Sequence, residues 1–355
     1  MIFINGLANI SPQPTLNTNT FLKDVKQYNT NMLQCIEPDY SEFFKAIALR
    51  RMSRILKLGW AAAKLCLDDA GLETPDAICV GSGKGCYKNT QIFLFSVDEN
   101  KEKFVPPSPF IQSAHGSIAA QIAIQTGCKN YNMTYAHRAF SFESALLDAQ
   151  MLLQEGKHKS ILVGGVDEIE KPQFSTFDRI GHYKKPDTNN LDLLTYHSKG
   201  TIAGEGSTFF VLSKHSTEKT YAAIQSVATF SNAENATTVK ETIDAFLKRE
   251  NLSVNEIDLI LLGLNGDSDF DPVYYDLMKT QFSGTDQAYF KHLCGEYHTS
   301  SAFALWLAGK VIREQSLPEI VSLNKQRKKP VKNILIYNQY RMKNHSLMLV
   351  CNPFG

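Results

Sequence analysis

The stretch "NMTYAHRAFSFESALLDAQMLLQEGKHKSILVGGVDE", from Asn132 to Glu168, decides the fold. A β-like run enters a sharp turn, a helix-like run leaves it, and a short apolar strand ends at Gly164 and Gly165. A reactive side chain is normally placed at such a strand-to-helix turn, because the N-terminus of the helix stabilises negative charge. At that point this chain has Ala139, whose methyl group cannot act as a nucleophile.

Length and composition set the broad class of the protein. The chain has 355 residues, of which 43% are hydrophobic and 21% charged, with a formal net charge of +1. These values predict a large buried core and argue against nucleic acid as a partner. The seven cysteines form no CxxC pair, so we expect reduced thiols, no metal site and a cytoplasmic location. No apolar run reaches about 18 residues, so we expect no membrane span.

Strand-like and helix-like segments alternate along the whole chain. The first residues, "MIFING", are expected to form a buried strand that Gly6 closes. Residues 52–72 carry apolar side chains at helical spacing and are expected to form a long helix that ends at Gly71. This alternation, with two buried strand runs in each half, predicts an α/β layered fold.

The domain organisation follows from the same pattern. The polar segment 183–200 is interpreted as an excursion over the surface. The alternation starts again after about residue 215, and no flexible linker precedes it. We therefore expect an N-terminal half, residues 1–214, and a C-terminal half, residues 215–355, packed as one unit.

Several motifs occur in a recognisable order through nearly the whole chain. They are "INGLANISP", "RRMSRILKLGWAAAKLCLDDAGL", "VGSGKG", "QSAHGSIAAQIAIQTG", "GGVDE", "GEGSTFFVL" and "FKHLCGEYHTSSAFALWLA". Together they resemble the β-ketoacyl synthases of the thiolase fold. The resemblance is specific because five or six motifs agree, whereas a single glycine motif is weak. It implies an αβαβα layered fold of two similar thiolase-like halves, with the altered turn in the first.

The resemblance also identifies the positions that carry the family's chemistry. In that family a cysteine takes up the acyl chain and two histidines polarise the malonyl thioester during decarboxylative condensation. Counted back without a gap from Gly156, the cysteine position is Ala139. The histidine positions are Asn265 and Glu296, whereas the family lysine is retained as Lys291. Asparagine cannot titrate, and a carboxylate repels a developing enolate. The glycine-rich gate is replaced by "YNQYRMKNHSL".

A synthase-like chain without these three groups resembles a chain-length factor. An engineered loss of the cysteine would leave both histidines, so we interpret the changes as native. The resemblance implies a non-condensing subunit that pairs with an active β-ketoacyl-ACP synthase and shapes the acyl tunnel. The chain would bind no cofactor and would act on acyl groups held by the phosphopantetheine arm of an acyl carrier protein. "HRAFSFESALLDA" most resembles ketosynthase-like proteins of aryl-polyene and flexirubin-type pigment clusters.

Other polar residues offer further candidates for the pocket. We include His137 and Phe140 beside the turn, and His298, which stands two residues after a histidine position. A hydrolase triad of His137, Ser141 and Glu143 is disfavoured, because residues two apart across such a turn point in different directions. Ser141 and Glu143 are instead expected to cap the helix.

Two basic clusters are candidates for docking an acidic carrier protein. One contains Arg327, Lys328 and Lys329, and the other is "LRRMSR", from Leu49 to Arg54. Such docking relies on weak, salt-sensitive contacts. A solvated surface without a partner is the alternative interpretation of both clusters.

Two other functions stay open at this point. One is an acyltransferase or thioesterase that uses His137, His298 or Glu296 in a rearranged pocket. The other is a homodimeric acyl-binding or scaffold protein with no enzyme partner. The acyl substrate, its chain length and the partner's identity lie beyond what the sequence predicts.

Overall fold

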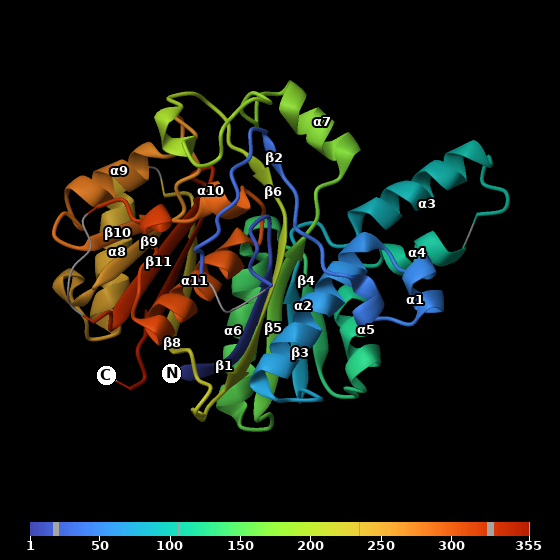
Figure 1. The fold of residues 1–355 in the computed structure, drawn as a ribbon, viewed down its shortest axis with the longest axis horizontal. Helices are drawn as coiled ribbons and strands as arrows, with labels where there is room; N and C mark the ends of the chain where they lie inside the picture. The colour runs from blue at the N-terminus through green and yellow to red at the C-terminus, as the bar shows by residue number, and fades with distance from the viewer. Residues whose placement is uncertain (17–20, 106, 234, 325–329, 355) are drawn as a thin grey trace.

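The computed structural model of the chain describes residues 1–16, 21–105, 107–233, 235–324 and 330–354. Ten strands form one continuous hydrogen-bonded sheet through the body of the protein (Figure 1). They are β1 (Ile2–Ile10), β3 (Ala77–Gly81), β4 (Asn132–Tyr135), β5 (Ser160–Asp167), β7 (Gly206–Ser213), β8 (Ala222–Ser231), β9 (Leu259–Leu262), β10 (Asp286–Tyr289), β11 (Asn333–Tyr340) and β12 (Asn344–Cys351). A small second sheet pairs β2 (Met32–Leu33) with β6 (Ala203–Gly204).

The large sheet consists of two halves with the same strand order. The first half runs β4-β3-β5-β7-β1 and the second runs β10-β9-β11-β12-β8. Counted along the chain, each order is third, second, fourth, fifth, first. Three antiparallel residue pairs between β1 and β8, from Ile2 with Ile224 to Ile4 with Ala222, join the halves. The predicted fold of two similar halves is therefore confirmed.

Helices form three layers around and between the two halves of the sheet. These helices are α2 (Arg54–Ala70) and α5 (Ser117–Thr126) outside the first half, α6 (Ser141–Glu155) and α11 (Ser300–Glu314) between the halves, and α8 (Ala236–Arg249) and α9 (Pro272–Lys279) outside the second half. Every residue from Ser300 to Ile312 is buried, because α11 packs against strands of both halves. The order of layers is thus αβαβα, as predicted.

Strand β3 shows why the buried strands are apolar on both faces. Ala77 and Cys79 point into the central core shared with α6, whereas Ile78 and Val80 point into the outer core with α2 and α5. A strand covered on both faces has no solvent side, so its sequence does not alternate with polar residues.

The remaining helices are shorter or lie outside the five layers, and the one at Lys291–Cys294 is fully buried. They are α1 (Ala46–Arg51), α3 (Tyr87–Glu99), α4 (Pro107–Ser113), α7 (Lys171–Arg179), α10 (Lys291–Cys294) and the 3-10 turns η1 (Tyr40–Glu42), η2 (Arg138–Phe140), η3 (Leu193–Thr195), η4 (Val254–Glu256) and η5 (Glu319–Val321). Helices α3 and α4 form an arm that projects from the body (Figure 1). Only Asn89 of α3 is buried, so no apolar stripe in the sequence predicted this helix.

One sequence-based expectation about the first strand is wrong. Gly6 does not close the first strand, because β1 bulges between Ile4 and Gly6 and continues to Ile10. A Cβ atom on Gly6 would collide with the backbone of α2, so this position needs glycine for close packing.

The segment 183–200 lies only partly on the surface. Lys185, Asp187 and Lys199 are exposed, as expected. Lys184 is 4% exposed, however, and its ammonium group donates hydrogen bonds to the carbonyl oxygens of Gly266 at 2.8 Å and Ser198 at 3.1 Å. Asn190 is fully buried and donates to the carbonyl of His292 at 2.7 Å. Some polar residues of this segment therefore satisfy buried backbone groups, whereas others face water.

All seven cysteines are buried and free of disulfide bonds. Within the described part of the chain, no helix is long and apolar enough to cross a membrane.

Candidate functional site

Ala139 lies at the turn between β4 and α6. Strand β4 ends at Tyr135, the 3-10 turn η2 follows, and α6 begins at Ser141. Arg138 has a φ of +51°, a left-handed conformation that residues with a side chain rarely adopt. Ala139 is 7% exposed. The sharp turn is therefore present, but the side chain at its apex is a methyl group.

The hydroxyl of Ser141 closes this turn. It accepts a hydrogen bond from the backbone N–H of His137 at 2.9 Å and donates to the carbonyl of Arg138 at 2.7 Å. The exposed His137 ring stacks on Phe140, with 5.5 Å between centroids, while Glu143 is fully buried. No side chain caps the N-terminus of α6, so the predicted capping by Ser141 and Glu143 is wrong. His137, Ser141 and Glu143 do not form a hydrolase triad either.

Asn265, Lys291 and Glu296 meet at one point, although they come from separate segments. Asn265 follows β9, Lys291 opens α10, and Glu296 follows α10. The Oε2 atom of Glu296 accepts hydrogen bonds from Nδ2 of Asn265 at 2.7 Å and from Nζ of Lys291 at 2.6 Å. The side chain of Lys291 is fully buried, and that of Glu296 is 9% exposed. A closed ion pair, with Asn265 hydrogen-bonded to it, thus stands at the positions that the sequence analysis assigned to the two histidines.

Two more acidic side chains surround this ion pair. Asp271 accepts hydrogen bonds from the backbone N–H groups of Asn265 and Gly266, at 3.2 and 2.7 Å. Burial raises the pKa of Asp271 to about 7, and these hydrogen bonds oppose that shift. Burial also raises the pKa of Glu143, which lies within electrostatic range of Lys291. One ammonium group is therefore shared among three carboxyl groups.

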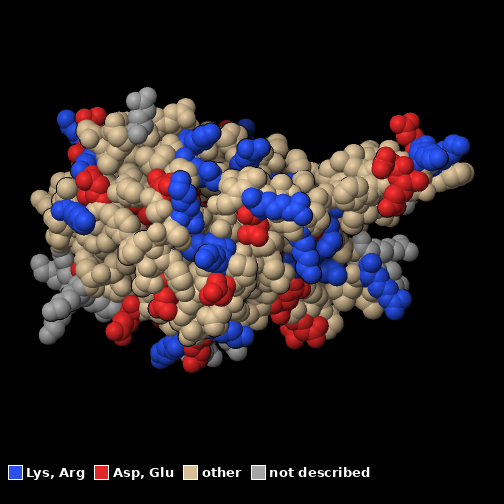
Figure 2. Space-filling view, turned by 90° about the horizontal axis from the view of Figure 1, so that it is seen from above, with Lys and Arg blue, Asp and Glu red and all other residues tan. Residues whose placement is uncertain are grey.

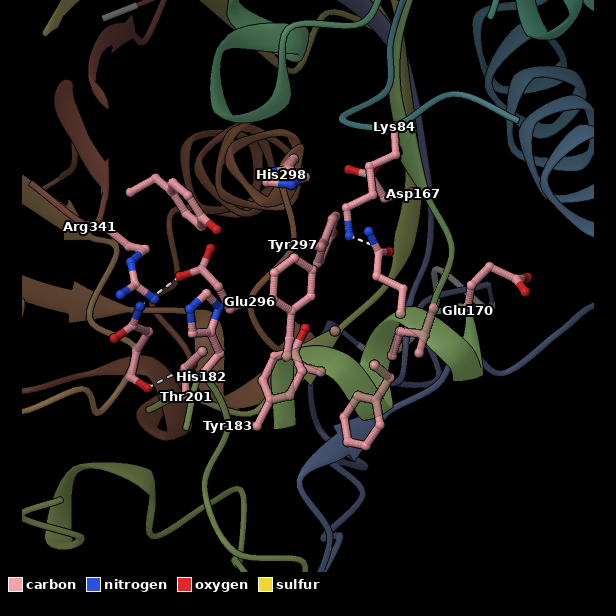
Figure 3. Close-up of a pocket in the computed structure, with 18 of the residues that line it drawn as sticks. Lys84, Asp167, Glu170, His182, Tyr183, Thr201, Glu296, Tyr297, His298 and Arg341 are labelled. Carbon is pink, nitrogen blue, oxygen red and sulfur yellow. Dashed lines mark hydrogen bonds between the residues drawn. The ribbon is translucent and has the colours of Figure 1, made fainter. Parts of the chain in front are cut away.

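A cavity that is partly open to solvent lies beside this cluster (Figure 3). Asn265 and Glu296 line its inner end, and Arg341 lines it from the hairpin between β11 and β12. Its walls are rich in aromatic rings: Phe174, Phe177, Tyr183, Phe270, Tyr297 and Tyr340. Such a cavity suits a flat or extended apolar group with a few polar contacts at one end.

Two histidines face the cavity as neutral imidazoles. Burial and the nearby charges of Lys84 and Arg138 lower the pKa of His298 to about 3. Burial and Arg341 also lower the pKa of His182. The ring of His298 packs directly on Gly83, where any Cβ atom would overlap it.

Helix α7 covers the cavity without a buried residue of its own. Two aromatic stacks hold it down: Phe174 on Tyr183 at 4.8 Å and Phe177 on His182 at 4.9 Å between centroids. Lys84 adds a hydrogen bond to Gln173. No helix in this segment is indicated by a buried apolar stripe, so sequence analysis did not identify α7 as part of the site.

A buried charge cluster lies under α7 and was also missed. Arg54 donates two hydrogen bonds to Glu205, at 2.8 and 2.6 Å, and one to Glu37. Its guanidinium lies 3.9 Å from the carboxylate of Glu168, whose side chain is 3% exposed. Burial and the charge of Glu170 raise the pKa of Glu168 to about 8. The glutamate of "GEGSTFFVL" was the available signal for this cluster.

This cluster makes stability depend on pH. In the unfolded chain Glu168 ionises near 4.5, whereas in the folded chain it ionises near 8. Protonated Glu168 therefore adds to the free energy of unfolding at low pH, and this contribution is lost as the pH rises through 8. We expect unfolding free energy to fall by about 1–2 kcal/mol between pH 7 and 8.5. Glu168→Gln should remove this loss.

Chemical denaturation at pH 7 and 8.5 checks this expectation. The window avoids His298, whose pKa of about 3 affects stability only below pH 6.5. Asp271, with a pKa of about 7, provides the matched control, because Asp271→Asn should leave most of the loss between pH 7 and 8.5 in place. An equal loss in wild type and Glu168→Gln contradicts the assignment.

The basic clusters predicted from the sequence have different outcomes. Arg54 is engaged in the buried cluster described above, so it does not belong to a docking surface. Arg327, Lys328 and Lys329 lie outside the described residues. Their interpretation as a docking patch stays a prediction.

The other predicted residues divide between the cavity and the turn. His298 and Glu296 line the cavity, whereas His137, Phe140 and Ala139 do not. The described residues contain no group of three or more side chains suited to hold a metal ion.

The repeated strand order, the five layers and the strand-to-helix turn define the thiolase-like class of α/β fold. Residues 9–218 match the family model "Beta-ketoacyl synthase, N-terminal domain". The chain belongs to the β-ketoacyl synthase family. No curated protein matches the sequence.

Three solved structures share this fold over nearly their whole length. The ishigamide ketosynthase/chain length factor has a TM-score of 0.80 and 16% identity, covering 100% of this chain and 99% of that one. A β-ketoacyl synthase from Burkholderia phymatum STM815 has a TM-score of 0.79 and 15% identity, covering 99% of both chains. A ketosynthase of AntDE:AntF, a complex with a type II PKS acyl-carrier protein, has a TM-score of 0.77 and 14% identity, covering 99% and 98%.

Proposed function

We propose that this protein is a non-condensing ketosynthase-like subunit, a chain-length factor, that pairs with an active β-ketoacyl-ACP synthase and shapes the acyl tunnel. The observation that carries the proposal is the state of the reaction centre. The turn holds Ala139, and the histidine positions hold a closed contact of Asn265, Glu296 and Lys291. A centre without a nucleophile and with its polar groups paired to one another is suited to structure instead of catalysis.

The surface for the partner is the edge of the sheet at β4. The sheet ends at β10 on one side and at β4 on the other. Strand β10 is buried, and its Ala288 forms a β-bridge with Ser322, whereas Asn132 and Met133 of β4 are exposed. Among the described residues, no strand pairs with the outer edge of β4. An unprotected edge strand is a template for pairing with another chain.

Apolar side chains continue this surface from β4 over α5 to the arm. Large hydrophobic residues here are 42–73% exposed: Ile92, Leu94, Phe95, Phe110, Ile111, Ile124 and Met133. An open groove of about 710 Å³ runs between α4 and α5 and includes Ile111 and Ile124. In Figure 2 the arm has a largely uncharged shaft and a charged tip. A patch of this kind marks an interaction site, and we assign it to the ketosynthase partner.

The walls of the cavity support a finer proposal about the chain that is extended. Aromatic rings from α7, the hairpin of β11 and β12 and the segment after α10 line this cavity. Flat rings pack well against a planar, conjugated chain. We propose that the acyl chain is of the aryl-polyene or flexirubin type.

An acyl carrier protein would deliver this chain on its phosphopantetheine arm. One of the structures that share the fold is a ketosynthase in complex with its acyl-carrier protein. We expect Arg327, Lys328 and Lys329 to take part in docking. Reversing their charges should weaken carrier binding about tenfold in dilute buffer and much less at high salt, because salt screens such contacts.

Titration of carrier protein against wild type and the triple variant measures this effect. Charge reversal at Lys157 and Lys159, which are exposed beyond the end of α6, is the control. Unchanged affinity of the triple variant in dilute buffer removes these residues from the docking surface.

Co-expression tests the proposed pairing. The chain is produced alone and together with a ketosynthase encoded beside it, and each sample is passed over a size-exclusion column. We expect a one-to-one complex that melts at a higher temperature than either subunit alone. A stable homodimer that ignores the ketosynthase would show a scaffold protein instead.

A second candidate function has one observation in its favour. Glu296 and His298 both line a cavity that is large enough for a substrate. A carrier-dependent acyltransferase or thioesterase would use these groups in place of the lost cysteine and histidines. Acyl turnover by the isolated protein, lost in both Glu296→Gln and His298→Asn, would establish this activity.

A further inference from the structure

The cavity presents more negative than positive groups to whatever enters it. Five acidic residues line it: Asp167, Glu168, Glu170, Asp267 and Glu296. Only two lysine or arginine residues line it, Lys84 and Arg341. Glu168 is protonated at neutral pH because its pKa is about 8, yet the acidic groups still outnumber the basic ones. The two histidines add no charge at neutral pH, because burial lowers the pKa of each.

The ion pair of Glu296 and Lys291 presents its carboxylate, not its ammonium group, to the cavity. Glu296 lines the cavity, whereas Lys291 is fully buried behind it and does not. The charge of Lys291 also acts on Glu143 and Asp271, which lie on its buried side. Figure 3 shows Glu296 at the cavity wall, and Lys291 is not among the lining residues, so an entering group meets the carboxylate before the ammonium.

The two cations of the cavity wall are already engaged with other groups. Lys84 donates a hydrogen bond to Gln173 and lies 5.3 Å from the ring centre of Phe177. The guanidinium of Arg341 lies 5.0 Å from the ring centre of Phe270. These contacts do not use every N–H donor of the two cations, so binding of the malonyl carboxylate by Lys84 or Arg341 is the alternative that the test below must exclude.

We propose that the cavity selects thioesters by charge, and that Glu296 sets this selection. It receives a pantetheine thioester whose acyl group is neutral and rejects one whose acyl group ends in a carboxylate. This inference rests on the proposed function only in that a carrier-linked arm enters the cavity. The subunit would then hold the growing chain but exclude the malonyl extender, which is left to the partner.

Electrostatics gives the size of the effect. A malonyl carboxylate at the inner end would stand close to Glu296, whose partner Lys291 lies behind it and outside the cavity lining. Two like charges a few ångströms apart in a partly hydrated site weaken binding by about tenfold or more. A neutral acyl group avoids this repulsion and contacts the aromatic walls.

Three pantetheine thioesters of matched size test the proposal: malonyl, carbamoylacetyl and isovaleryl. Carbamoylacetyl replaces the terminal carboxylate by a neutral amide, and isovaleryl replaces it by an isopropyl group of similar shape. Binding to the full-length chain is measured by calorimetry in dilute buffer. We expect both neutral probes to bind at least about tenfold more tightly than the malonyl probe.

Glu296→Gln keeps the shape of the side chain and removes its charge. It should narrow the difference between malonyl and carbamoylacetyl to about twofold or less. Glu155→Gln removes a charge from a side chain that is 55% exposed at the end of α6, and it should leave the difference unchanged.

Three results would overturn the inference. In the first, the malonyl probe binds as tightly as the neutral probes, which would make Lys84 or Arg341 an anion site. In the second, Glu296→Gln leaves the full difference in place, which would move the selection to another acidic residue. In the third, no thioester binds, so the cavity receives no arm at all. These affinities are measured on the isolated chain and do not depend on a complex with a ketosynthase. Failure of the proposed pairing would be seen instead in the co-expression experiment.

Discussion

Ala139→Cys is expected to restore a reactive thiol but not condensation. The new thiol would stand at the N-terminus of α6, where the helix dipole lowers the pKa of a cysteine and favours its thiolate. It should therefore react with iodoacetamide faster than any of the seven buried native cysteines. Uptake of an acyl group is the most that this single change should permit.

Condensation needs donors that polarise the malonyl thioester while carbon dioxide leaves. Losing one such donor typically lowers the rate by about 100- to 1,000-fold. In this chain Asn265 donates its amide hydrogen to Glu296, and Glu296 is a carboxylate that accepts a second hydrogen bond from Lys291. We expect measurable condensation only when Ala139→Cys is combined with Asn265→His and Glu296→His.

Product formation from malonyl carrier protein, followed by mass spectrometry, measures both variants. Ala139→Ser is the matched control for the shape of the turn, and thermal melting verifies that each variant folds. Chain extension by the single Ala139→Cys variant at the rate of the triple variant would show that Asn265 or Glu296 is misaligned. His298, which lines the same cavity, would then be the first residue to change.

Ile124→Glu is expected to abolish pairing with the ketosynthase at micromolar concentrations. Ile124 is 73% exposed in the last turn of α5 and lines both the groove toward α4 and the adjoining groove toward β4. A charge buried at the centre of an interface removes on the order of 2–4 kcal/mol or more of binding energy, about 30- to 1,000-fold in affinity. The same change should not unfold the isolated chain, because the side chain is already exposed.

Phe354→Glu is the matched control for this prediction. Phe354 is 61% exposed near the C-terminus, on the side of the molecule opposite the arm (Figure 1). Size-exclusion chromatography of both variants with the ketosynthase should show loss of the complex for Ile124→Glu alone. If Ile124→Glu forms the complex as wild type does, the partner binds elsewhere.

The fold was predictable because its pattern is local and repeated. Buried strands such as β5 and helices such as α6 carry apolar residues at the spacing their structure requires, and glycines mark their ends. The arm was not predictable, because α3 buries only Asn89 against the rest of the chain and so lacks an apolar stripe. Its apolar residues face outward, which sequence patterns do not distinguish from burial.

The site was predictable only where a position in a motif defined it. The spacing of "KHLCGEYHTS" identified Lys291 and Glu296, but not that they pair with each other or with Asn265. Glu143 was expected to cap α6 and is instead fully buried, without a capping hydrogen bond. Contacts between distant segments, such as Arg54 with Glu205, depend on the complete fold and have no trace in local spacing.

The central layer of helices couples the folding of the two halves. Helix α11 belongs to the second half of the chain, yet it packs on β1 and β7 of the first half as well as on β8, β11 and β12. Helix α6 belongs to the first half and packs on β8 of the second. Neither half can therefore complete its core alone, and both should lose hydrogen-exchange protection in a single cooperative opening. A mutation that destabilises the packing of α11 should therefore lower hydrogen-exchange protection at the β4 edge as well, although the two are far apart in the sequence.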